Sequence, residues 1–167
     1  YPEEDLVCLE VGTFYEQQDK LEKAHEIYQN YLKRVSPETR SNPDILLNQG
    51  VIYAKQGKLD EAIDYWKQTL KCDPHYGIAF GNLMNAYYDK KDLSCMWVFF
   101  ELGLKATPVP WKNYENIFQQ AGNEQLPDFG PGFLYLEEYT KTHPEDAQGY
   151  LALAQVSNQL GDKEKAK

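Results

Sequence analysis

Three asparagines, Asn48, Asn82 and Asn116, recur at a constant spacing along the chain. An asparagine amide carries two N–H donors and one oxygen acceptor, so it can pair with both the N–H and the C=O of a peptide bond. Amides at a regular spacing are therefore suited to holding the backbone of an extended polypeptide, whatever its side chains. The alternative is that they are solvated surface residues, alike because the segments carrying them arose by duplication.

The predicted peptide-binding site extends to residues that flank these asparagines on the same helical face. Tyr88 is the best apolar anchor among them, because tyrosine is enriched at interface hot spots. An ordinary tyrosine packed on the next helix is the alternative for Tyr88. Together with the three asparagines, the candidates are Leu47, Val51, Asn85, Tyr88, Lys112, Glu115 and Gln119.

The residues that could support catalysis or hold a metal are too isolated to do so. Cys72 and His75 have a short metal-like spacing, but no second pair of ligands accompanies them. The triplet 128–130 (Asp-Phe-Gly) copies a kinase motif without the glycine-rich loop or the catalytic loop that would give it meaning. No Ser/His/Asp or Cys/His set shares one face, as catalysis would require. We therefore expect a non-enzymatic chain with no cofactor and no metal.

The elements that must position these residues are clearest between residues 43 and 76. Leu46 and Gly50 fall on one face of a first predicted helix, and Ala62 and Trp66 on one face of a second. Residues 55–58 (Lys-Gln-Gly-Lys) form the hinge, and the Asp-Pro pair at 73–74 ends the second helix. Neither amphipathic helix can bury its apolar face alone, so the unit is one of a stack.

The same pattern recurs along the whole chain at nearly regular intervals. Residues equivalent to Gly50 are Gly12, Met84, Phe118 and Ala154, and the tyrosine that follows one turn later recurs as Tyr15, Tyr53 and Tyr87. The small residue of the second helix recurs as Ala24, Ala62, Met96, Gly132 and Ala166, followed one turn later by Tyr28, Trp66, Phe100 and Leu136. This lattice resembles the tetratricopeptide repeat (TPR), whose period is about 34 residues.

The resemblance implies an all-α TPR solenoid, a right-handed superhelix of antiparallel helix pairs whose first helices line the concave side. It implies one domain over 1–167, as a fragment of a longer chain. Four full repeats (about 5–42, 43–76, 77–110 and 111–146) precede a truncated fifth (147–167). The asparagines resemble those of the asparagine-ladder TPR superhelices, which hold extended peptides in the concave groove.

The pattern also predicts local structure. Small residues at Gly50 and Ala62 let the helices of one repeat approach closely, while Tyr53 and Trp66 fill the space between repeats. Glycines at 57 and 161 supply the freedom of short turns. In the fourth repeat, we expect a first helix ending near residue 121, an irregular loop, and a second helix from about residue 132.

Composition limits the class of partner. A net charge of −9 and a pI near 4.8 argue against nucleic acid, whose phosphates need a basic surface. No apolar run approaches the length that spans a membrane. Three cysteines cannot all pair within one chain and favour reduced thiols in a cytoplasmic compartment, although an exported protein can also carry a few.

We therefore expect a scaffold that binds a peptide segment of a partner protein in its concave groove. One alternative is a self-association module that uses either the terminal repeat or exposed aromatics of the third repeat, Trp97 and Phe99. Another is a substrate-docking arm of a larger multidomain enzyme, because the TPR resemblance alone does not name a ligand.

Overall fold

The structure is a computed structural model that describes residues 2–35, 42–106, 108–123 and 130–165. Over these ranges the chain contains nine α-helices and no strand, which confirms the all-α prediction. The chain divides into two compact units, Tyr1–Ala79 and Phe80–Lys167. None of the helices in the described ranges is both long and apolar enough to cross a lipid bilayer.

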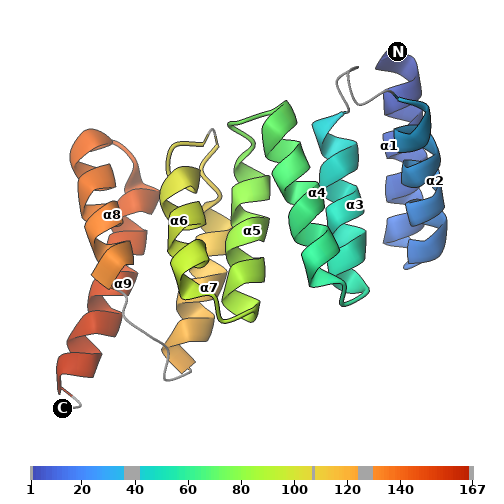
Figure 1. Cartoon of the computed structure of the whole chain (residues 1–167). Coiled ribbons are helices and arrows are strands. Elements are labelled where there is room, and N and C mark those ends of the chain that lie inside the picture. Colours follow the sequence, from blue (N-terminus) through green and yellow to red (C-terminus); the bar gives the residue numbers. More distant parts are fainter. Residues whose placement is uncertain (1, 36–41, 107, 124–129, 166–167) are drawn as a thin grey trace. The chain divides into compact units, whose positions relative to one another are not determined.

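The first unit is built from two antiparallel helix pairs (Figure 1). α1 (Pro2–Gln17) packs against α2 (Leu21–Arg34), and α3 (Pro43–Lys55) packs against α4 (Leu59–Cys72). α3 also contacts both α1 and α2, and its Ile45 and Ile52 join the core that those two helices form.

Side chains and prolines set the ends of the second pair. The side-chain oxygen of Asn42 accepts a hydrogen bond from the backbone N–H of Asp44 (2.9 Å), which caps α3, and Pro43 is the first residue of the helix. α4 ends at Cys72, and the next residue, Asp73, has an extended backbone (φ −133°, ψ 99°) because Pro74 follows it. The stop that the sequence predicts at the Asp-Pro pair is confirmed.

A glycine lets α3 and α4 approach closely. A Cβ at Gly50 would lie 2.5 Å from Nε1 of Trp66, and this indole nitrogen donates to the backbone oxygen of Leu47 (3.2 Å). Trp66 therefore packs against the first helix of its own pair. Tyr53 does reach the preceding pair, because its ring meets that of His25 edge-on at 5.3 Å.

The turn inside the second pair needs a left-handed backbone. Gly57 has φ +76°, so the prediction that a glycine serves this turn is confirmed. The equivalent turns of the preceding and following helix pairs use Asp19 (φ 56°) and Lys91 (φ 60°). Gly161 does not serve a turn, because α9 runs through it, and our prediction there is wrong.

The second unit contains most of α5 and four further helices. α5 (Gly77–Asp89) begins shortly before the division and is followed by α6 (Leu93–Gly103), α7 (Trp111–Asn123), α8 (Gly130–Thr142) and α9 (Ala147–Lys165). α9 packs against both α7 and α8, and α6 packs against α8. α7 ends slightly later, and α8 starts slightly earlier, than the sequence predicts. The loop expected between them lies mostly outside the described residues.

Aromatic rings form the centre of the second unit. The ring of Phe100 is fully buried against those of Trp97 (5.4 Å), Tyr114 (4.4 Å) and Phe118 (5.8 Å). A Cβ at Gly132 would also lie 2.5 Å from the Trp97 ring. Trp97 is thus part of the core. The exposed aromatic pair considered above does not exist, because Phe99 is half-buried and stacks on Tyr87.

Gly57 and Gly161 have different backbone conformations, so replacing each with alanine should change the free energy of unfolding in opposite directions. A Cβ would meet no atom of the surrounding structure within 4 Å at either Gly57 or Gly161, so contacts with other parts of the chain play no part. Gly57→Ala should lower the free energy of unfolding by about 1 kcal/mol, because alanine is disfavoured at φ +76°. Gly161→Ala should raise it by up to about 1 kcal/mol, since alanine is the better helix former. Urea denaturation followed by circular dichroism measures both, and equal shifts of the same sign would contradict this assignment of the two backbones.

Candidate functional site

α5 is buried on most of its circumference and keeps one accessible stripe. Ile78, Asn82, Asn85 and Asp89 are the half-buried or exposed residues that succeed one another on this stripe, each about one helical turn after the last. The other faces include the buried residues Leu83 and Met84, and Met84 belongs to the core of the second unit. The structure thus places both predicted asparagines of α5 on its one polar, accessible stripe.

α7 carries a second accessible stripe. Lys112, Asn116 and Gln119 are exposed there, and Glu115 is half-buried. α5 and α7 approach closely, because a Cβ at Gly81 would lie 2.5 Å from the side-chain carbon Cγ of Asn113. Asn82 directly follows Gly81, and Asn116 lies one helical turn beyond Asn113. These two asparagines of the predicted ladder therefore lie on two helices in contact.

Asn48 differs from the other two because its amide is already in use. It lies on α3 in the first unit, and its Nδ2 donates a hydrogen bond to the phenol oxygen of Tyr28 on α2 (3.2 Å). The Tyr28 hydroxyl in turn donates to the carboxylate of Glu16 on α1 (2.8 Å). Asn48 thus ends a chain of side-chain hydrogen bonds that joins α1, α2 and α3.

Burial changes the ionisation of this chain of hydrogen bonds. Loss of solvent raises the pKa of Glu16, an effect that the hydrogen bond from Tyr28 and the charge of Lys55 oppose in part. Burial also raises the pKa of Tyr28 far beyond the neutral range, so its hydroxyl keeps its proton and remains the donor to Glu16. The arrangement is structural, and it leaves one N–H and the oxygen of the Asn48 amide for other partners.

Two predicted site residues prove to be buried. Leu47 is 7% exposed, and Tyr88 is 5% exposed within the aromatic core of the second unit. Each lies on the side of its helix that packs on neighbouring helices, so neither side chain forms an open groove anchor, and these two predictions are corrected. Val51 and Asn85 are half-buried and keep accessible surface. The other members of the predicted site stay a prediction.

The structure also contains a groove that the sequence reasoning missed. A hollow of about 690 Å³ lies in the second unit, bordered by α6, the segment that follows it, and α8. Its lining comes from second helices of the predicted repeats and the segment after α6, whereas the predicted peptide-binding residues all lie on first helices. The signal in the sequence was the row Tyr135, Glu138, Tyr139 and Thr142, in which aromatic and polar residues share one face of α8.

A comparison with family models assigns the segment that organises the first unit. The model of the tetratricopeptide repeat matches residues 43–76, which hold α3 and α4. The TPR resemblance inferred from the sequence is thereby confirmed for this segment, although a comparison with curated protein sequences gives no match.

Solved structures extend the likeness to the whole fold. MamA from Desulfovibrio magneticus RS-1 is 16% identical, with a TM-score of 0.62, over 98% of this chain and 89% of that chain. A tetratricopeptide repeat protein from Parabacteroides merdae is 17% identical, with a TM-score of 0.61, over 97% of this chain and 61% of that chain. One chain of the Cut9–Hcn1 hetero-tetramer of the APC/C is 18% identical, with a TM-score of 0.60, over 91% of this chain and 29% of that chain. The chain therefore has the TPR solenoid fold.

The hydrogen bond of Asn48 predicts that the three asparagines differ in their effect on stability. Asn48→Ala should lower the free energy of unfolding of the first unit by about 1 kcal/mol, because the bond to Tyr28 is lost. Asn116→Ala should change it by less than about 0.5 kcal/mol, since that side chain is exposed. Urea denaturation of the two variants tests this difference, and equal effects would show that the Asn48–Tyr28 bond is not formed in solution.

Proposed function

We propose that this chain is a protein-interaction scaffold and that an extended segment of a partner protein binds along the accessible stripes of α5 and α7. The proposal rests on where Asn82 and Asn116 lie and on the hydrogen bonding of their side-chain amides. Both lie on accessible stripes of helices in contact, and within the described residues no hydrogen bond engages either side-chain amide. Two such amides are donors and acceptors ready for the backbone of a ligand.

The geometry of the helices supports an extended ligand. Packed helices lie roughly 8–10 Å apart, which corresponds to about three residues of extended chain. One amide on each helix can therefore meet peptide groups at that spacing along a bound strand. Lys112 and Gln119 flank Asn116 on the same stripe and would contact the ligand's side chains.

The charge and the structural neighbours support a protein ligand. A net charge of −9 disfavours nucleic acid and favours neutral or basic segments. One neighbour, Cut9, is seen in a hetero-tetramer with Hcn1. A general protein-binding role fits this fold, and the identity of the partner is left to experiment.

The test uses a double variant confined to the second unit. Asn82→Ala/Asn116→Ala leaves the Asn48–Tyr28 bond intact, so a loss of binding is not confused with a loss of stability. The wild-type chain captures partners from a lysate of the source cells, and their binding segments are mapped with overlapping peptides. The affinity of the mapped peptide, measured by isothermal titration calorimetry, should fall on the order of tenfold in the double variant, because two amide–peptide hydrogen bonds are lost.

Asn30→Ala/Asn158→Ala is the matched control, because these asparagines are exposed on α2 and α9. It should retain wild-type affinity. A mapped peptide that binds the double variant as tightly as the wild type would contradict the proposed track.

Self-association is the second candidate function, and the surface of α9 favours it. Tyr150 is 46% exposed and Leu151 is 55% exposed, although both are large apolar side chains. Apolar side chains that gather on one surface mark contact sites. Sedimentation velocity should then show a dimer or larger species that Leu151→Lys returns to the monomer. A monomeric wild-type chain would end this alternative.

A further inference from the structure

The groove in the second unit is an open hollow with an apolar floor. Its volume of about 690 Å³ lies within the range of sites that hold small ligands or the side chains of a bound peptide. One wall is formed by the end of α6 and the segment after it, through Leu104, Ala106, Pro108 and Val109. The opposite wall is formed by α8. The two walls come from elements that share one aromatic core, so the groove is held open by the fold.

Aromatic rings on α8 give this groove a rigid polarised surface. The Tyr139 ring stacks on His143 (4.2 Å between centroids, 10° between planes), and its hydroxyl donates to the carboxylate of Asp146 (2.7 Å). Tyr135 lies one turn earlier, is half-buried, and lines the same groove. The faces of such rings carry partial negative charge and attract cations.

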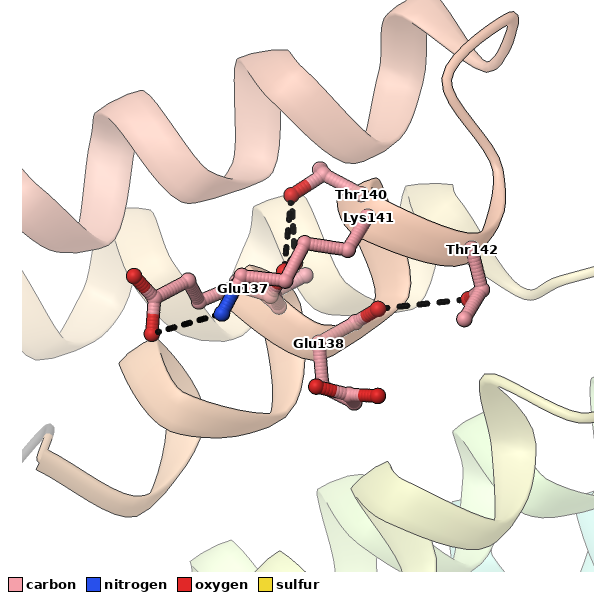
Figure 2. Close-up of polar contacts among 6 residues, drawn as sticks. Glu137, Glu138, Thr140, Lys141 and Thr142 are labelled. Carbon is pink, nitrogen blue, oxygen red and sulfur yellow. Dashed lines mark hydrogen bonds and ion pairs between the residues drawn. The ribbon is translucent and has the colours of Figure 1, made fainter.

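The charge at the rim is unbalanced because one carboxylate has no partner. Glu101 pairs with Lys105 (3.2 Å), and Glu137 pairs with Lys141 (3.5 Å), so the nearby lysines are occupied. Figure 2 shows that the Glu138 carboxylate points away from the Glu137–Lys141 pair. In the described part of the chain, no hydrogen bond or ion pair engages that carboxylate.

Spacing on α8 brings the free carboxylate and the aromatic surface together. Tyr135, Glu138 and Thr142 follow one another at about one helical turn each, so all three lie on one face of the helix. Residues spaced in this way have Cβ atoms roughly 5–6 Å apart. One group could therefore lie over the Tyr135 ring and still reach the Glu138 carboxylate.

We propose that this groove binds a peptide segment of a partner protein through an arginine side chain. The apolar stem of the arginine packs on Leu104 and Val109, its planar guanidinium stacks on Tyr135, and its N–H groups pair with Glu138. Arginine fits better than lysine, because its guanidinium is planar, stacks on aromatic rings and forms two parallel hydrogen bonds with a carboxylate. This site is separate from the stripes of α5 and α7, because its lining comes from α6, α8 and the segment after α6.

The experiment is an NMR titration of the full chain with two blocked tripeptides, Ac-Leu-Arg-Leu-NH2 and Ac-Leu-Gln-Leu-NH2. The arginine probe should cause saturable shifts at Leu104, Val109 and Tyr135. The glutamine probe should bind about twofold to fivefold more weakly, the difference that one partly exposed ion pair contributes. Glu138→Gln should weaken the arginine probe by about the same factor.

Glu137→Gln is the matched control, since Glu137 is the adjacent residue and its carboxylate pairs outside the groove. It should change the affinity of the arginine probe by less than about twofold. Glu138→Lys should in turn favour Ac-Leu-Glu-Leu-NH2 over the arginine probe. Equal binding of the arginine and glutamine probes to the wild type, no effect of Glu138→Gln, shifts that map elsewhere, or no binding would each overturn the proposal.

Discussion

The close contact between a glycine on one helix and a large aromatic ring on another is the interaction on which both units depend. Trp66 lies against Gly50 in the first unit, and Trp97 lies against Gly132 in the second. Tyr114 occupies the equivalent space beside Gly103, and its hydroxyl donates to the backbone oxygen of Phe100 (2.9 Å). Because even one methyl group would displace these rings, the glycines set the distance between helices.

This packing also determines which surfaces are left for binding. α5 is covered on most sides, so its polar residues are confined to the single stripe that includes Asn82. On α8 the same core takes up Leu136 and leaves Tyr135 and Glu138 at the edge of the groove. The accessible polar residues are therefore displayed on a rigid frame, and less conformational entropy is lost when a ligand binds.

The two proposed surfaces of the second unit recognise different parts of a ligand. Asparagine amides on α5 and α7 suit the peptide backbone and are indifferent to sequence. An aromatic wall with one free carboxylate suits a single kind of side chain and therefore discriminates between sequences. A partner segment that met both requirements would be bound with more selectivity than either surface provides alone.

Residue types and their spacing are enough to predict the helical repeat and the turn at Gly57. These features are local, since they follow from helical periodicity, a left-handed turn and the spacing of residues along the chain. Tertiary packing buries Leu47 and Tyr88, joins Asn48 to Tyr28, and leaves the Glu138 carboxylate without a partner among the described residues. Burial and pairing depend on which neighbouring helix covers a residue, and helical periodicity does not specify that neighbour.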